Sequence, residues 1–172
     1  MLQRLRLMCM NHKGFTLIEV LVVITITSCI GGGAAAAVYQ VININALSGN
    51  HVIAVKQVEN AVYWIGRDVQ MAQVLQPGGV SGFPLSLSWV EWDNTGHQVA
   101  YVLEDGQIRR SHSVNGGEPT WLVVADHINA SSEKTNCQYA EGVFTFKVTS
   151  FVSGFRSATE SRVVQVIPRP AP

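Results

Sequence analysis

The sequence has few cysteines and no spacing of them that suits a metal or a disulfide. Only Cys9, Cys29 and Cys137 occur in the 172 residues. Cys9 lies near the N-terminus and Cys29 lies inside a long apolar run, so Cys137 stands alone in the remaining sequence. This excludes an intradomain disulfide and a Cys-x-x-Cys metal site. We therefore expect no metal and no other cofactor.

Patterns typical of enzymes are also missing. His97, His112 and His127 have neither a paired cysteine nor a Glu-x-x-His spacing, and surface or strand-edge positions explain them. There is no Gly-x-Ser-x-Gly motif. Asp93 to Gly96 and Glu104 to Gly106 lack the alternating oxygen ligands of a calcium loop, and hairpin turns explain both. We predict that the protein is not an enzyme.

Basic residues are scarce over a long stretch. Arg4, Arg6 and Lys13 stand in the first 14 residues with no acid among them, although the formal net charge of the chain is zero. Between Lys13 and Lys56 there is no other Lys or Arg, and Glu19 is the sole acid. No clustering of Lys and Arg indicates a nucleic-acid partner.

Residues 15–42 form the long apolar run. As a helix these 28 residues would extend about 42 Å, and about 20 residues suffice to cross a bilayer. The basic residues precede the run, so the positive-inside rule places residues 1–14 in the cytoplasm. Two simple interpretations are a single-pass anchor and a secretory signal peptide, with Ala34 to Ala37 as a cleavage site.

The apolar stripe continues past the length that a membrane requires. Six residues recur at steps of three and four and fall within about 100° of a helical wheel: Val55, Val58, Val62, Ile65, Val69 and Ala72. This predicts that residues 43–78 form an amphipathic helix of the soluble domain. Pro77-Gly78-Gly79 is expected to end it, and a bend is expected at Leu47 to Asn50, where Asn50 is able to cap a second segment.

The segment Lys13 to Val20 reads Lys-Gly-Phe-Thr-Leu-Ile-Glu-Val. With a basic leader before it and an apolar helix after it, it closely resembles the prepilin processing site of type IV pilins and type II secretion pseudopilins. The resemblance implies that prepilin peptidase cuts between Gly14 and Phe15, removes residues 1–14 and methylates the new amine of Phe15. A small residue at position 14 lets the extended backbone enter a protease site, and the apolar helix stays in the product.

Glu19 lies near the start of the apolar run, where an unpaired carboxylate costs free energy. A charge in a membrane helix is a functional hypothesis that requires a partner. In the cleaved chain Glu19 is the fifth residue, within reach of a neighbouring subunit's terminal ammonium, and the two attract strongly in a low dielectric. We predict that this pair favours assembly and sets the axial register. The alternative is that Glu19 snorkels to the lipid headgroups.

Gly31, Gly32 and Gly33 interrupt the same helix. Each costs about 1 kcal/mol relative to alanine in a helix interior. Related filaments contain a stretch that melts on assembly, and the resemblance places this weak point in the same region. The alternative is close helix packing through small residues, since Ala34 to Ala37 continue the pattern.

Beyond residue 79, short β-type runs alternate with turn signals. The runs are residues 85–92, 98–103, 107–114, 121–125, 142–152 and 161–167, with a polar loop at 129–136. We predict an antiparallel β meander over residues 79–167 and a tail at 168–172. The fold class is α+β: a long N-terminal helix, half membrane and half amphipathic, packed on an antiparallel sheet as in the pilin fold. Four tryptophans are most simply assigned to the core: Trp64, Trp89, Trp92 and Trp121. Trp89 and Trp92 are expected on opposite sheet faces, so the alternative for one of them is a subunit contact or a ligand surface.

A second resemblance concerns the type of subunit. Arg67 to Gln70 and Tyr101 to Arg110 are similar to the corresponding regions of J-type pseudopilins and larger minor pilins, as are Ala125 to Ile128 and Val166 to Arg169. The cysteine pair that staples many major pilins is absent. The resemblance therefore implies a minor pilin or a pseudopilin.

The partners implied are prepilin peptidase, other pilin or pseudopilin subunits, an inner-membrane assembly platform, and lipid before assembly. The chain would span the inner membrane once, with its C-terminal domain outside the cytoplasm, and then enter a periplasmic or extracellular filament. The alternative function is a filament-tip binding module for a surface, DNA or a secreted protein. Arg109, Arg110 and His112 are the DNA-contact candidates, but an exposed strand face explains them, so nucleic acid is not expected.

Overall fold

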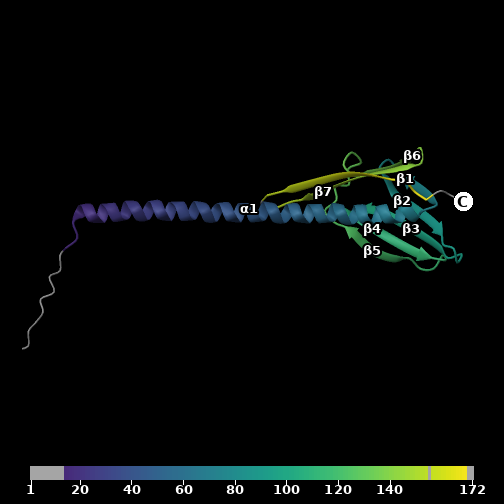
Figure 1. Ribbon diagram of the computed structural model, residues 1–172, viewed down its shortest axis with the longest axis horizontal. Coiled ribbons are helices and arrows are strands. Elements are labelled where there is room, and N and C mark those ends of the chain that lie inside the picture. Colours follow the sequence, from purple (N-terminus) through teal and green to yellow (C-terminus); the bar gives the residue numbers. More distant parts are fainter. Residues whose placement is uncertain (1–13, 155, 170–172) are drawn as a thin grey trace, which may run out of the picture. The chain divides into compact units, whose positions relative to one another are not determined.

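The computed structural model describes residues 14–154 and 156–169 and divides into two units, residues 1–42 and 43–172 (Figure 1). The leader, apart from Gly14, and the last three residues of the expected tail lie outside the described residues. The elements are α1 (Leu17–Met71), β1 (Val74–Gly78), β2 (Gly82–Val90), β3 (Gly96–Glu104), β4 (Gln107–Val114), β5 (Thr120–Ala125), β6 (Asn136–Ala140), β7 (Val143–Val152) and β8 (Ala158–Val166).

The first unit contains the N-terminal part of α1. Its described residues, 14–42, are all exposed, and most of their side chains are apolar. The helix is long enough, and over an 18-residue window with mean hydropathy 2.0 apolar enough, to cross a membrane. Thr25 and Thr27 direct their hydroxyls to the carbonyls of Leu21 and Val23, at 2.8 Å each. These bonds satisfy the two donors inside the helix, as a lipid environment requires.

In the second unit, one face of α1 is buried. Val58, Ile65, Val69 and Ala72 are fully buried, as the sequence stripe predicted, while Val55 and Val62 are half-buried. The remaining buried positions on this face are Ala54, Ala61 and Asp68. The alternation of three- and four-residue steps therefore does mark the core-facing side of the helix.

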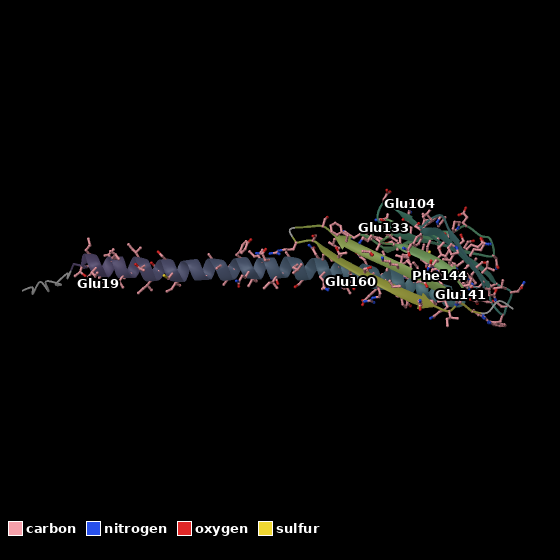
Figure 2. All side chains as sticks on the ribbon, turned by 90° about the horizontal axis from the view of Figure 1, so that it is seen from above. Glu19, Glu104, Glu133, Glu141, Phe144 and Glu160 are labelled. Carbon is pink, nitrogen blue, oxygen red and sulfur yellow. The ribbon has the colours of Figure 1, made fainter. Side chains whose placement is uncertain are left out.

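Two antiparallel sheets pack with this part of the helix. The first has the order β1-β2-β3-β4-β5 and the second β6-β7-β8. One hydrophobic cluster joins α1 to both sheets, with Leu85, Tyr101 and Ile108 from the first and Phe144 and Phe146 from the second. Phe144 is labelled in Figure 2. The predicted α+β arrangement of a long helix on antiparallel strands is confirmed, but the strands form two sheets instead of one meander.

The end of the helix differs from the prediction. α1 ends at Met71, and residues 74–78, which were expected to belong to the helix, form β1. Val74 and Leu75 pair with Ser88 and Leu87 of β2. These ladder bonds come from β2, the next strand along the chain, and a helical period of apolar residues carries no information on strand pairing. The expected stop signal, Pro77-Gly78, lies instead at an irregularity in the β1–β2 register.

Two further expectations were wrong. Residues 47–50 continue α1 without a break, and Asn50 is not a cap, because its side-chain amide donates to the carbonyl of Arg156. The segment 136–140, of which residue 136 was assigned to a polar loop, forms strand β6 against β7. Only Cys137 of this short strand is buried, so it lacks the alternating pattern of a half-buried strand.

Two tight turns have the same backbone form. Asp105 and Gly106, between β3 and β4, have φ of 50° and 73°, at a turn that the sequence predicted. Glu141 and Gly142, between β6 and β7, have φ of 53° and 80°, at a turn that was not predicted. Two consecutive positive φ values are typical of the type I′ hairpin turn. In the turn after β2, the amide of Thr95 donates to Asp93 Oδ1 at 2.9 Å, and this bond lowers the pKa of Asp93.

Gly82 lies where the two sheets meet. The amide of Cys137 donates to the carbonyl of Ser81 at 2.9 Å, and the buried Cys137 thiol donates to the carbonyl of Gly82 at 3.2 Å. Gly82 has φ of +79°, and a Cβ atom there would lie 2.0 Å from the Cys137 carbonyl oxygen. Only glycine fits this junction without a shift of the backbone.

We expect Gly82→Ala to lower the free energy of unfolding by about 3 kcal/mol, from left-handed strain and overpacking together. Gly116→Ala is the matched control, since Gly116 has φ of +71° but open space around its Cβ position. That control should lose only about 1 kcal/mol. Urea unfolding of the full-length chain in detergent, followed by tryptophan fluorescence, measures both, and equal losses would show that the sheet junction is not tight.

Candidate functional site

The expected cleavage bond lies just before the helix. Gly14 and Phe15 are outside α1, which begins at Leu17. Apart from Gly14 and its chain neighbours, no atom of the described residues lies within 4 Å of a Cβ placed on Gly14, and Phe15 is 80% exposed. A non-helical, open backbone is the form that a protease can bind in an extended conformation.

Thr16 sets where the helix begins. The amide of Glu19 lies 3.3 Å from Thr16 Oγ1 and 3.0 Å from the Thr16 carbonyl oxygen. Thr16 is thus the N-cap, and Thr-x-x-Glu is the capping-box sequence, with Glu19 in the first turn. A carboxylate there also interacts favourably with the helix dipole. This cap was not predicted from the sequence, although the Thr-x-x-Glu pattern from Thr16 to Glu19 was a sufficient signal for it.

Glu19 is exposed on the first turn of α1 (Figure 2). It is the only Asp or Glu in residues 14–42, on a helix surface that is otherwise largely apolar. Its pairing with the N-terminus of a neighbouring chain stays a prediction.

The three glycines are helical. Gly31, Gly32 and Gly33 lie within α1, and nothing lies within 4 Å of a Cβ placed on any of them. The glycines therefore leave a bare strip of backbone in the middle of the apolar segment. Both hypotheses for this strip, melting on assembly and close packing of helices, stay predictions.

The comparisons with known proteins concern this same segment. Residues 9–35 match a family model described as the prokaryotic N-terminal methylation motif. The chain carries this methylation motif. Together with the long apolar helix, the motif is consistent with a type IV pilin-like protein that is anchored in a membrane. It implies processing by prepilin peptidase and assembly with other pilins. No match was found among curated proteins or among solved structures.

Beyond the methylation motif, a buried polar cluster joins α1 to the first sheet. Asp68, on the buried face of the helix, accepts from the hydroxyl of Tyr101 at 2.5 Å. Arg110 makes a two-pronged contact with the same carboxylate, from Nε to Oδ2 at 2.7 Å and from a terminal nitrogen to Oδ1 at 3.2 Å. The side chain of Asp68 is 3% exposed and that of Arg110 is 12% exposed. This cluster fixes the register of the helix on the sheet.

The charges in the cluster stabilise one another. Burial raises the pKa of Tyr101, and the neighbouring Asp68 carboxylate raises it further, so the phenol stays a donor. Burial opposes the charge of Arg110, but the hydrogen bonds and negative charge of Asp68 outweigh burial and raise the pKa of its guanidinium. The expectation that Arg110 lies on a solvated face was therefore wrong. Arg109 does point to the other face, where it lies over the Trp121 ring at 5.3 Å.

Two of the three histidines that lack a metal-binding spacing, His97 and His112, lie in contact with each other. His97 on β3 and His112 on β4 stack at 5.3 Å between ring centroids and share a hydrogen bond of 3.0 Å between Nδ1 and Nε2. Trp89 stacks on His97 at 5.1 Å. Burial lowers the pKa of His112, and the charge of Arg110 lowers it further. The spacing of the two histidines in the sequence could not predict that they pair, because the pairing depends on the register between β3 and β4.

These histidines form no metal centre with their neighbours. Within residues 14–154 and 156–169, no group of three or more His, Cys, Asp or Glu could hold a metal ion. His127, the third histidine, is exposed after β5, with Nδ1 3.7 Å from Asp126 Oδ2.

The tryptophans divide into two groups. Trp89 is buried and Trp64 is half-buried, as expected for the core. Trp92 is 96% exposed and Trp121 is 54% exposed, so the core assignment was wrong for both. Trp92 lies in the turn after β2, and Trp121 lies on the edge strand β5.

Proposed function

We propose that the chain is a structural subunit of a type IV pilus-like filament, in the role of a minor pilin or pseudopilin. The observation that carries the proposal is the methylation motif at the start of a membrane-length apolar helix. Cleavage between Gly14 and Phe15 removes the basic leader, keeps the helix, and creates the terminal ammonium that is to be methylated. A secretory signal peptide would instead be lost together with its apolar segment.

In this proposal the same helix serves two environments. Before assembly, residues 15–42 hold the chain in the inner membrane, with residues 43–172 outside the cytoplasm. In the filament, the exposed apolar surface of this segment packs against the equivalent helices of other subunits. Glu19 is the polar feature of that surface, and an ammonium from a neighbour compensates its charge. The assembly platform delivers subunits from one environment to the other.

The acidic side chain provides the test. We expect Glu19→Ala to be cleaved at the wild-type rate but to enter filaments at least about tenfold less, since about 1.4 kcal/mol corresponds to a tenfold change in an equilibrium. The measurement is the amount of cleaved chain in the sheared-filament fraction, or crosslinked to other pilin-like subunits, relative to the membrane.

Glu59→Ala is the matched control. Glu59 also lies exposed on α1, with a loose contact of 3.8 Å to Arg162. Exposed pairs of this kind contribute about 0–1 kcal/mol, so this variant should assemble normally. Equal assembly by both variants would contradict a role for Glu19, and a defect in cleavage would place its role in processing.

A further inference from the structure

His97 and His112 form a pair on the side of the first sheet that faces the C-terminal end of α1. The register of β3 and β4 places His97 opposite Val114 and His112 opposite Val99, so the two rings are diagonal neighbours. Their ring planes are within 10° of each other, and His97 Nδ1 lies 3.0 Å from His112 Nε2. Trp89, from β2, is nearly parallel to both rings and only 5% exposed. Side chains of three neighbouring strands therefore meet at this pair.

The contact between the two rings limits how many protons the pair can hold. A hydrogen bond between two ring nitrogens requires a proton on one of them and a free lone pair on the other. This condition can be met when both rings are neutral and when one of them is protonated. When both are protonated, His97 Nδ1 and His112 Nε2 each carry a proton, so two donors and two positive charges face each other at 3.0 Å. A second proton is therefore incompatible with the contact.

The charges around the pair are balanced before the pair is protonated. Among the described residues, four charged side chains border the same recess as the histidines, two of each sign: Arg67 and Asp68 from α1, Arg110 from β4, and Glu91 after β2. The next charges are Asp93, in the turn after β2, and Arg169, after β8, again one of each sign. Strand β5, which pairs with β4, has no ionisable side chain from Thr120 to Ala125. Two protonated histidines would therefore add an excess of positive charge at this end of the sheet.

The two histidines face different charges. His97 Nε2 lies 3.3 Å from Glu91 Oε1, so a positive charge on His97 has a carboxylate beside it. Burial lowers the pKa of His112, the charges of Arg110 and His97 lower it further, and Asp68 only partly opposes them. The folded chain resists a proton on His112, whereas the unfolded chain accepts it at the ordinary pKa of about 6.5. This difference contributes stability above about pH 6.5 that is lost as the pH falls below that value.

We propose that the pair of His97 and His112 is an acid-sensitive switch: below about pH 6, a second proton breaks the contact and releases the β2–β3 turn from the end of α1. Trp89 then becomes exposed next to Trp92, which borders the same cavity and is already 96% exposed. This end of the domain therefore presents a more apolar surface in acid. The core between α1 and the second sheet, around Phe144, contains no part of the pair and stays packed. The switch depends only on the second unit and not on the filament role.

The first test measures the unfolding equilibrium of the full-length chain in detergent, by urea and tryptophan fluorescence, at about pH 7.5 and about pH 5. One proton that the unfolded chain binds and the folded chain excludes shifts this equilibrium about tenfold per pH unit. The shift on acidification should therefore be at least about tenfold larger for the wild type than for His112→Gln, whose neutral amide donates to His97 Nδ1 without titrating. His97→Gln should reduce the shift in the same way. His51→Gln, the matched control, removes an exposed histidine of α1 and should behave as the wild type.

The second test locates the response by hydrogen exchange and mass spectrometry of the same chain, corrected for the intrinsic effect of pH. On acidification, protection should fall at least about tenfold in residues 89–99 and 110–114 but not in β7 and β8. In His112→Gln it should be retained throughout. The proposal is overturned if the wild type and His112→Gln shift equally, or if His51→Gln removes as much of the shift as His112→Gln. A loss of protection that is equal in β7 and β8 would show whole-domain unfolding and would also overturn the switch.

Discussion

Gly14→Leu is expected to leave the leader attached to nearly all of the chain. The bond after Gly14 lies in open backbone ahead of the Thr16 cap, and a bulky side chain at position 14 would obstruct entry into the peptidase site. We expect the cleavage rate to fall at least about a hundredfold, which corresponds to about 2.7 kcal/mol in the activation barrier. Intact mass and immunoblot of the membrane fraction, from cells that contain the peptidase, measure the ratio of long to short chain.

Gly33→Leu provides the matched control. It is the same substitution in the same unit, and the Cβ position of Gly33 is just as open as that of Gly14. The Gly33→Leu chain should be cleaved normally, and so should Gly14→Ala, which adds only a methyl group. If Gly14→Leu were cleaved as well as the Gly33 control, the position of the cut would be wrong.

Asp68→Ala is expected to lower the free energy of unfolding by about 3–5 kcal/mol. The substitution leaves Arg110 charged and buried without its partner, and it removes the acceptor of the Tyr101 hydroxyl. A loss of this size is a large share of the stability of a typical domain. Urea unfolding followed by tryptophan fluorescence is the measurement.

A triple variant separates the charge from the packing. Asp68→Leu, Arg110→Met and Tyr101→Phe together leave an apolar set of similar volume, and such replacements are often neutral or stabilising. The triple variant should therefore be more stable than Asp68→Ala. If it were no more stable, shape would account for the loss and the buried ion pair would not. Asp93→Ala, which removes a fully exposed carboxylate from a turn, should cost much less.

The features that could be predicted from the sequence are those with local signals. The buried stripe of α1 follows from residues three and four apart, and the turn at Asp105 follows from the glycine after it. The motif around Gly14 is a continuous segment, so it was recognisable without a fold. Each of these signals consists of residues that are close together in one continuous segment.

The features that were missed depend on pairing between segments, which the pattern of one segment alone does not show. Strand β1 forms because β2 pairs with it, and β6 because β7 does. Asp68 and Arg110 are 42 residues apart, and only the fold brings them together. A signal did exist, because Asp68 occupies the buried stripe between Ile65 and Val69, and an acid on such a face requires a buried partner. The sequence could not identify that partner as Arg110.

The identity of the first residue of the mature chain tests the central claim most directly. Mass spectrometry of the chain purified from membranes or filaments should show a product that begins at Phe15, carries one methyl group on its terminal amine, and retains residues 15–42. A product that begins at any other residue, or that has lost the apolar helix, would contradict the account.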